Sequence, residues 1–201
     1  MAEKLKLAVL GSTKGTDMQA IIDAIKIGTL PAEIVLVVSD RNDSGILDKA
    51  KSAGIQTFVA DYKQFGSRKD AEIAMIKELK EKGTRLILLI GFMKILTPYF
   101  VSEYKGRIWN IHPSLLPKYA SGMDLDVYKA VLQNHERETG CTLHEVIEKV
   151  DAGRIIMQKM CAVMPNDTPE SLKERVQRLE QECILEALGK VISGRLAIGS
   201  H

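Results

Sequence analysis

Short apolar runs alternate with longer segments of helical spacing along the first half of this chain. Each run is rich in aliphatic or β-branched residues, as expected for a strand buried on both faces of a sheet. The runs cover residues 5–10, 33–39, 56–59, 85–90 and 107–111, and the helical segments between them cover residues 17–26, 45–53 and 67–82. Because strands and helices alternate with short connections, the sequence predicts an α/β fold with a doubly wound, mostly parallel sheet.

The pattern changes after residue 110. A helix is expected over residues 124–134, followed by two adjacent strand-like runs, 140–146 and 154–163. These two runs predict an antiparallel hairpin at an edge of the sheet. A long C-terminal helix then begins, with Thr168 as its N-cap and Pro169 at its first helical position.

Composition excludes several classes of protein. The 201 residues are 45% hydrophobic, which is enough for one core, so we expect residues 1–201 to form a single domain. Lys and Arg (28) nearly balance Asp and Glu (26), so nothing attracts the chain as a whole to nucleic acid or to an acidic membrane. No apolar run approaches the roughly 20 residues of a membrane span, and the N-terminus lacks the pattern of a signal peptide. We therefore expect a cytoplasmic protein without membrane or nucleic-acid partners.

The first strand runs into a glycine-bearing turn at the start of a helix. The turn reads Gly11-Ser-Thr-Lys-Gly15-Thr-Asp17. Free N–H groups and the positive end of the helix dipole suit such a turn to a phosphate. Thr13 stands where a dinucleotide motif needs Gly, and Thr16 where a P-loop needs Lys, so a single phosphomonoester is favoured over a polyphosphate. A tight turn without a ligand is the alternative. Thr16 and Gln19 also have the spacing of a capping box.

The strand at residues 107–111 ends in polar residues. Asn110 and His112 share one face of it, about 7 Å apart. Pro113 cannot continue a central strand, so both residues lie at the carboxyl end, where open α/β sheets bind ligands. A histidine can transfer a proton near neutral pH, and an amide can donate to a developing oxyanion. Turn residues satisfied by local hydrogen bonds are the alternative.

Two acidic residues of the second half have ordinary explanations. Asp151 stands two residues before Gly153, between the two late strands, so spacing alone predicts a hairpin turn. A nearby histidine would give Asp151 a further role. Glu180 falls inside the apolar stripe of the last helix, and a rim residue that snorkels or pairs with an arginine would explain it.

Three segments together carry a resemblance to a known family. They are Asn110-Ile-His-Pro-Ser-Leu-Leu-Pro117, Gly140-Cys-Thr-Leu-His144 followed by Val150-Asp-Ala-Gly153, and Gly91-Phe-Met-Lys-Ile-Leu96. Over nearly its whole length the chain resembles the phosphoribosylglycinamide formyltransferases. These enzymes of purine biosynthesis move a formyl group from 10-formyltetrahydrofolate to the amine of glycinamide ribonucleotide. The resemblance implies a Rossmann-like fold, small-molecule substrates, formyl-folate as cosubstrate, no metal, and a monomer or homodimer.

The resemblance also implies roles for individual residues. Asn110, His112 and Asp151 would be catalytic, Gly15, Thr16 and Asp17 would lie against the phosphoribosyl substrate, and Glu180 would hold the ribose hydroxyls. The folate-binding residues would be Arg68, Met93, Lys94, Ile95, Leu96, Val101, Asn110, Ile147, Glu148, Lys149 and Val150. The N-terminal part of the domain would thus bind the phosphoribosyl substrate and the C-terminal part the formyl-folate. His144 is expected to be structural.

The chemistry that the resemblance implies is direct acyl transfer without a covalent enzyme intermediate. The substrate amine attacks the formyl carbon, while Asn110 and protonated His112 stabilise the tetrahedral oxyanion. Asp151 orients His112 and raises its pKa. A proton is then relayed to the folate nitrogen as it leaves.

Several positions depart from the common pattern of the family. Asp17 stands where an asparagine is usual, and its carboxylate should repel a phosphate unless Lys14 neutralises it. Lys94 replaces a frequent arginine, which keeps the charge and loses the fork geometry. Asp124 and Asp126 occupy a loop in which many members have a histidine.

Two other functions stay open from the sequence. One is another enzyme that uses 10-formyltetrahydrofolate, either a transferase acting on a different amine or a hydrolase. The other is a dinucleotide-binding module that would use Gly11 and Asp40, although the glycine fingerprint of that class is missing.

Overall fold

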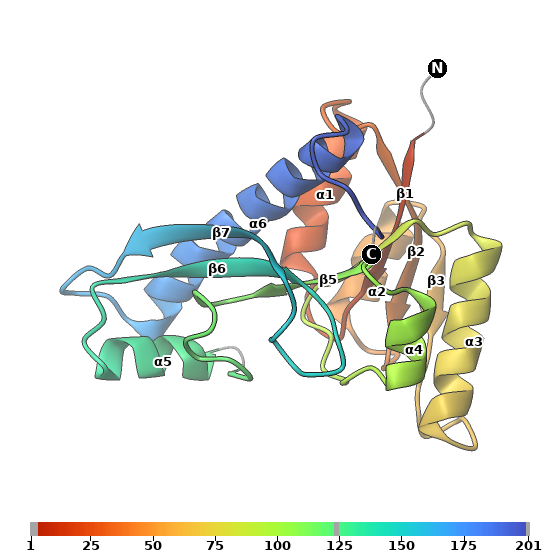
Figure 1. The fold of residues 1–201 in the computed structure, drawn as a ribbon, viewed down its shortest axis with the longest axis horizontal. Coiled ribbons are helices and arrows are strands. Elements are labelled where there is room, and N and C mark those ends of the chain that lie inside the picture. Colours follow the sequence, from red (N-terminus) through yellow and green to blue (C-terminus); the bar gives the residue numbers. More distant parts are fainter. Residues whose placement is uncertain (1–3, 123–124, 200–201) are drawn as a thin grey trace.

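One mixed sheet runs through the molecule (Figure 1). The computed structural model describes residues 4–122 and 125–199. The strands of this part are β1 (Leu5–Leu10), β2 (Ala32–Ser39), β3 (Thr57–Val59), β4 (Leu86–Leu89), β5 (Ile108–His112), β6 (Glu138–Glu145) and β7 (Ile155–Ala162). They lie in the order β3-β2-β1-β4-β5-β6-β7. Neighbours from β3 to β5 are parallel, whereas β6 pairs antiparallel with β5 and with β7. The predicted sheet and its antiparallel edge hairpin are confirmed.

Helices connect the strands and cover both faces of the sheet. Within the described residues they are α1 (Thr16–Lys26), α2 (Gly45–Ser52), α3 (Arg68–Glu81), α4 (Pro98–Glu103), α5 (Leu125–Gln133) and α6 (Pro169–Ile192). The long C-terminal helix is confirmed with its predicted start, because the Thr168 side chain accepts from the Ser171 N–H and Pro169 follows it.

Alternating side chains of the parallel strands enter two separate cores. Leu7 and Val9 of β1 point into a core with apolar residues of α1, α2, α5 and α6. Ala8 and Leu10 point into the other core, with residues of α3 and α4. Burial on both faces explains why these strands are continuous apolar runs in the sequence.

Two local expectations differ from the structure. The predicted capping box of α1 is absent from the described contacts, since the N-cap is Gly15 in the left-handed conformation (φ 65°). A Cβ on Gly15 would lie 2.5 Å from Ile46 Cγ1, so the turn needs a glycine to let α2 approach. The sequence reading also lacked α4, which is six residues long and begins at Pro98 after the Thr97 cap. Such a helix is too short to give a periodic pattern.

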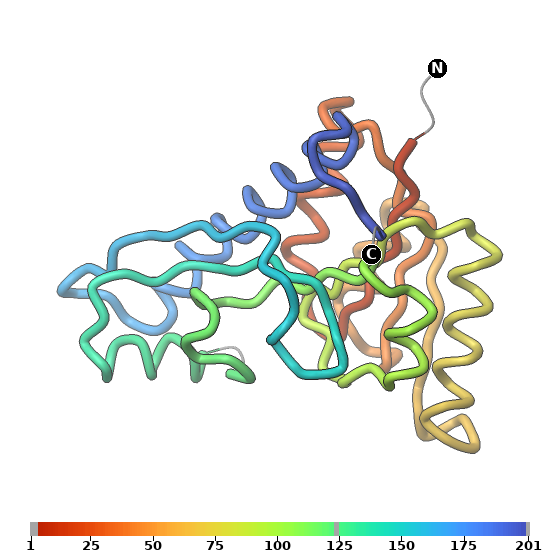
Figure 2. The backbone as a smooth tube through the Cα atoms, in the orientation of Figure 1, coloured from red at the N-terminus to blue at the C-terminus, as the bar shows by residue number. Residues whose placement is uncertain are grey.

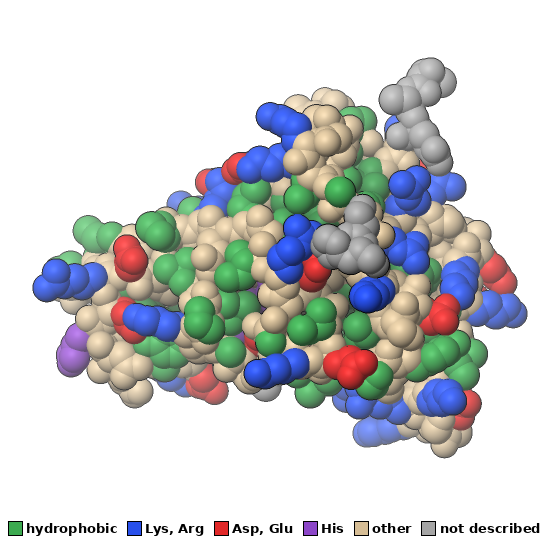
Figure 3. Space-filling view, in the orientation of Figure 1, with side chains coloured by type: hydrophobic (Ala, Val, Ile, Leu, Met, Phe, Trp, Pro, Cys, Tyr) green, Lys and Arg blue, Asp and Glu red, His purple; other side chains and the backbone are tan. Residues whose placement is uncertain are grey.

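Two further features concern the surface charges and the segment that follows α6. Lys and Arg side chains are interspersed with Asp and Glu side chains on the face in Figure 3, as the balanced composition suggests. The C-terminal segment turns back from α6 toward the middle of the molecule (Figure 2), where Gly199 N–H donates to Gly106 O at 3.2 Å. Among the helices of the described residues, none has the length and apolar character to cross a membrane.

Candidate active site

A cavity of about 820 Å³ opens at the carboxyl ends of the central parallel strands. The turn after β1, the segment after β4 and the end of β5 form one part of its wall. The end of β6, the β6–β7 connection, one face of α6 and residues between β5 and β6 form the rest. This is the position at which open α/β sheets bind ligands. Residues from both ends of the chain therefore meet in one cavity.

Asn110 and His112 both line this cavity from β5. They alternate with Trp109 and Ile111, which are buried in the core shared with α1 and α6. The two polar side chains therefore share the opposite face, as the strand period predicts. Pairing with β6 places Asn110 opposite His144.

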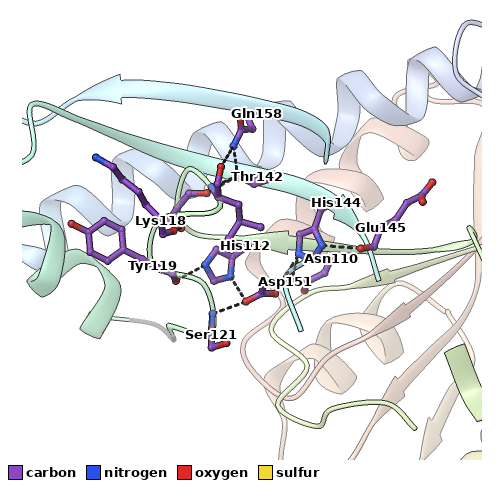
Figure 4. Close-up of polar contacts among 12 residues, drawn as sticks. Asn110, His112, Lys118, Tyr119, Ser121, Thr142, His144, Glu145, Asp151 and Gln158 are labelled. Carbon is purple, nitrogen blue, oxygen red and sulfur yellow. Dashed lines mark hydrogen bonds and ion pairs between the residues drawn. The ribbon is translucent and has the colours of Figure 1, made fainter. Parts of the chain in front are cut away.

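The imidazole of His112 is held between two acceptors (Figure 4). Its Nε2 lies 3.0 Å from the carbonyl oxygen of Tyr119, and its Nδ1 lies 3.4 Å from Asp151 Oδ2. Burial lowers the pKa of His112 below its usual 6.5, and the attraction of Asp151 and the Tyr119 carbonyl opposes this only in part. The predicted effect of Asp151 on the pKa has the right sign, but burial outweighs it. Burial thus favours the neutral ring of His112, whereas the acceptors at its two nitrogens favour the charged ring.

Asp151 reaches His112 from the connection between β6 and β7. Its backbone is in the left-handed region (φ 51°), as fits a turn, so the hairpin interpretation is correct for the backbone. Its side chain accepts from the Ser121 N–H at 2.8 Å. Burial would raise the pKa of Asp151, but the contact with His144, the Ser121 N–H and the charge of His112 together lower it. Asp151 is thus an ionised carboxylate in this site.

His144 belongs to the same cluster, which the sequence reading missed. Its Nε2 lies 3.1 Å from Asn110 Nδ2 and 3.4 Å from Asp151 Oδ1, and its Nδ1 lies 2.9 Å from the Glu145 carbonyl oxygen (Figure 4). Nε2 thus faces both the Asn110 amide and the Asp151 carboxylate, and the tautomer of the ring decides whether it accepts from the first or donates to the second. This contact depends on which residues of β5 and β6 stand opposite each other. The sequence of each strand, taken by itself, does not show that pairing.

The turn after β1 forms another part of the wall. Thr13, Lys14, Thr16 and Asp17 line the cavity, whereas Gly15 shapes the turn without lining it. The first helical hydrogen bond runs from Gln19 N–H to Gly15 O. The preceding N–H groups therefore stand at the positive end of α1, as an anion site requires.

Asp17 and Glu180 are buried carboxyls that line the same cavity. Asp17 is 6% exposed and Glu180 is 7% exposed. Burial raises the pKa of Asp17 to about 7, against a hydrogen bond from Gln181 that lowers it. Burial, and then the charge of Asp17, raise the pKa of Glu180 well above its ordinary value. Glu180 therefore faces the cavity and does not snorkel from a rim, and no arginine pairs with it among the ion pairs of the described residues.

Comparison with known proteins identifies the family. The sequence model described as "Formyl transferase" matches residues 5–188. The chain belongs to the formyl transferase family. The resemblance to phosphoribosylglycinamide formyltransferases is confirmed as well. This formyl transferase is 38% identical to the phosphoribosylglycinamide formyltransferase of Haemophilus influenzae, over 96% of this chain and 90% of that protein.

Solved structures and longer relatives agree with this assignment. The structure of a phosphoribosylglycinamide formyltransferase from Coxiella burnetii has a TM-score of 0.92 and 42% identity, covering 98% of this chain and 92% of that one. A trifunctional purine biosynthetic protein from Gallus gallus is 46% identical over 98% of this formyl transferase. The chain spans 14% to 19% of the length of such trifunctional relatives, so it matches one part of them.

Most residues that the resemblance assigned to folate lie around the cavity of this formyl transferase. Those that line it are Met93, Lys94, Ile95, Leu96, Asn110, Ile147 and Val150. Met93, Ile95, Ile147 and Val150 are apolar side chains at least 41% exposed, as expected of residues that a ligand covers. Glu148 and Lys149 belong to the same loop but do not line the cavity. Val101 belongs to α4, and its side chain is buried in the core between α4 and the sheet.

Arg68 and Lys94, which the resemblance assigned to folate binding, form ion pairs with acidic residues of the chain in this structure. Arg68 does not line the cavity, and its Nε lies 3.5 Å from Glu72 Oε1 one turn along α3. Lys94 lines the cavity with its Nζ 3.7 Å from Asp40 Oδ2. Of the two departing aspartates, Asp126 is exposed on α5 and pairs with Lys129, and Asp124 lies outside the described residues.

Metal chemistry was not expected of this site. Among residues 4–122 and 125–199, no group of three or more His, Cys, Asp or Glu side chains has a geometry that could hold a metal ion. The polar groups of the cavity are hydrogen-bond donors, carboxyls and three lysines. They suit acyl transfer, in which preorganised donors meet the developing charge.

Proposed function

We propose that this formyl transferase moves the formyl group of 10-formyltetrahydrofolate to the amine of phosphoribosylglycinamide, in purine biosynthesis. The observation that carries the proposal is the cluster at the end of β5. A histidine, an amide and a carboxylate line one cavity wall, and the carboxylate comes from a separate loop to within 3.4 Å of the histidine. An acyl transfer needs a proton carrier, an oxyanion donor and a group that orients the carrier.

Asn110 is proposed to stabilise the oxyanion. One N–H of its amide is directed to His144, which leaves the other for the oxygen of the formyl group as the tetrahedral intermediate forms. A neutral amide donates this hydrogen bond without adding a charge to the site. The hydrogen bond becomes stronger as negative charge develops on the formyl oxygen. Removing one such donor typically costs about 10²–10³ in rate.

His112 is proposed to carry the proton. Because burial lowers its pKa, the ring is neutral before reaction and can take the proton that the attacking amine loses. Asp151 then stabilises the imidazolium, and the proton passes to the folate nitrogen as the bond to the formyl carbon breaks. For Nε2 to serve the substrate, its contact with the Tyr119 carbonyl must be exchanged for one with the substrate.

The two substrates are proposed to occupy different parts of the cavity. Thr16, Asp17 and the N–H groups of the Gly15 turn would hold the phosphoribosyl part, with Glu180 on its hydroxyls. The apolar side chains of residues 93–96, with Ile147 and Val150, would cover the folate ring system. Both parts belong to one proposed formyltransferase domain, residues 1–201.

The proposed setting is the cytoplasm, with small molecules as the partners of a monomer or homodimer. The balanced charge of the chain supports this, because neither nucleic acid nor an acidic membrane is attracted to it as a whole.

Formyl transfer by purified wild type and His112→Ala tests the proposal. With phosphoribosylglycinamide and 10-formyltetrahydrofolate, and without added metal, wild type should give formylated product. His112→Ala should lose at least about 10²-fold in kcat, because the proton carrier is gone. Asp151→Asn, which keeps the shape and removes the charge, should lose kcat with little change in either KM.

Three outcomes would contradict this assignment. Near-normal kcat in His112→Ala would remove the histidine from the chemistry. Release of tetrahydrofolate without the amine acceptor would indicate a hydrolase. Transfer to another amine, with no product from phosphoribosylglycinamide, would indicate a formyltransferase of different specificity.

A further inference from the structure

Two segments of the cavity wall leave the sheet side by side. They are the turn after β1 (residues 11–15) and the segment after β4 (residues 90–97). The parallel pairing of β1 with β4 continues past the strand ends, because Ser12 N–H donates to Gly91 O at 3.0 Å. Beyond this point the turn leads to the proposed phosphoribosyl side of the cavity, and the other segment leads to the proposed folate side.

The side chain of Ser12 joins the two segments where they diverge. Its Oγ accepts a hydrogen bond from Met93 N–H at 2.9 Å, and the residue is 4% exposed. A side-chain oxygen thus replaces the backbone carbonyl that a continuing strand would offer to this N–H. Ser12 is not among the described residues that line the cavity. It therefore acts on the wall and not on a ligand.

Close packing adds to this link. Gly91 has a φ of 62°, and a Cβ on it would lie 2.6 Å from Thr13 Oγ1. Only a glycine lets the turn approach the other segment so closely. Because Thr13 and Gly91 both line the cavity, a shift of one wall segment disturbs the other.

The segment after β4 depends on anchors at its ends. Met93 and Ile95 line the cavity and are 46% and 62% exposed, so their side chains are not held in a core. The Met93 N–H is bound by Ser12, and the Thr97 N–H donates to the buried Glu72 at 3.0 Å. Ser12 is thus the anchor nearest to the turn, and the main chain of Met93 takes its position from it.

We propose that Ser12 is a positioning residue that couples the two sides of the cavity, so that a phosphoribosyl compound bound at the turn strengthens binding of the folate. The identity of the two ligands rests on the proposed function. A ligand that fixes the turn also fixes Met93 through Ser12, and the second ligand then orders less of the wall when it binds. Such a coupling is reciprocal, because it is one free energy shared by two sites.

Calorimetric titration measures the coupling with ligands that lack the reacting groups. Ribose 5-phosphate has no glycinamide amine, and tetrahydrofolate has no formyl group, so the contact between amine and formyl carbon is absent. In wild type, saturating ribose 5-phosphate should lower the Kd of tetrahydrofolate at least about fivefold, as is typical of coupled sites. Saturating tetrahydrofolate should lower the Kd of ribose 5-phosphate by the same factor.

Ser12→Ala removes the acceptor of Met93 N–H and keeps the backbone hydrogen bond to Gly91. Each ligand alone should still bind, whereas the coupling should fall below about twofold, because the two segments then move more independently. Ser44→Ala is the matched control. It removes a buried hydroxyl from the N-cap of α2, whose Ile46 N–H donates to the Thr13 carbonyl, and it should keep the wild-type coupling.

Amide NMR spectra follow the path through Ser12 with one ligand present. In wild type, ribose 5-phosphate alone should shift the amide resonances of Met93 and Ile95, which lie on the proposed folate side. The shifts should be absent in Ser12→Ala and present in Ser44→Ala. A residue that only stabilised the fold would leave them unchanged.

The possible results separate this proposal from the proposed function. Equal coupling in wild type and Ser12→Ala, or loss of coupling in Ser44→Ala as well, would overturn the role of Ser12. Formyl transfer by a wild type without coupling would overturn that role alone. Failure of formyl transfer, with both ligands bound and coupled, would reject the proposed function alone. A wild type that binds neither ligand would reject both.

Discussion

At the residue scale, opposing influences on His112 decide the chemistry. Burial favours the neutral ring, whereas Asp151 and the Tyr119 carbonyl favour the charged one. In the proposed mechanism this combination gives a base that burial keeps available and that Asp151 stabilises once it accepts a proton. A histidine on the protein surface would lack both influences and would gain nothing on protonation.

Replacing Asp151 should separate these influences. In Asp151→Asn the attraction to the imidazolium is lost while burial stays, so the pKa of His112 should fall below its already lowered wild-type value. A depressed folded-state pKa means that this group's contribution to stability is present above about pH 6.5 and is lost as the pH falls. The loss of stability at acidic pH should be larger in Asp151→Asn than in wild type. NMR titration of the imidazole protons measures the shift, with the exposed His135 as reference resonance. An unchanged or higher pKa of His112 would contradict the electrostatic role given to Asp151.

At the element scale, the cavity wall depends on a buried anchor between two helices. Glu72 of α3 is fully buried and accepts from the Thr97 N–H at 3.0 Å and from the Thr97 hydroxyl. Thr97 is the N-cap of α4 and follows the wall residues 93–96. Glu72 therefore fixes the end of the segment proposed to cover the folate.

Removing this anchor should loosen that wall. Glu72→Ala leaves the N–H and hydroxyl of Thr97 without their acceptor, which should cost about 1–3 kcal/mol in the free energy of unfolding. Urea denaturation measures the loss, and KM for the formyl-folate should rise more than KM for the ribonucleotide. The exposed Glu81 of the same helix is a matched control, and Glu81→Ala should stay within about 0.5 kcal/mol of wild type. Equal stabilities of the two variants would show that Glu72 is not an anchor.

The helices and strands could be predicted from the sequence where buried side chains recur with a regular period along the chain. The strands buried on both faces and the amphipathic α6 have such repeats, and so do the polar positions 110 and 112 at a strand end. The contact of Asn110 with His144 depends on how β6 aligns with β5, and the presence of Asp17 and Glu180 in one cavity depends on how α1 packs against α6. These are distances between elements, and they leave no periodic trace in a single sequence.

At the scale of the whole molecule, the cavity connects parts of the chain that are far apart in sequence. Its wall runs from the β1–α1 turn through β5 to α6. A ligand seated there contacts elements of the parallel part of the sheet and of the hairpin side together. Binding should therefore stabilise the native state as a unit, because a ligand that binds only the folded protein shifts the unfolding equilibrium.

Thermal unfolding with ligands checks this expectation. Phosphoribosylglycinamide at 100 times its Kd should add about 2.7 kcal/mol of stability, which is roughly 5–10 °C in Tm for a chain of this size. NAD at the same multiple of a typical dinucleotide Kd should leave Tm unchanged, because the turn after β1 lacks the glycine fingerprint. A shift with NAD and none with the ribonucleotide would favour the dinucleotide-binding module.

The strand β5 has a parallel neighbour on one side and an antiparallel neighbour on the other. Translation delivers β1 to β5 first, so the parallel half of the sheet can assemble while the rest of the chain is still inside the ribosome. At that stage β5 is an edge strand that carries Asn110 and His112. His144 and Asp151 are synthesised later, and Glu180 follows them in α6. A nascent chain thus contains Asn110 and His112 before the residues that contact their side chains have been synthesised.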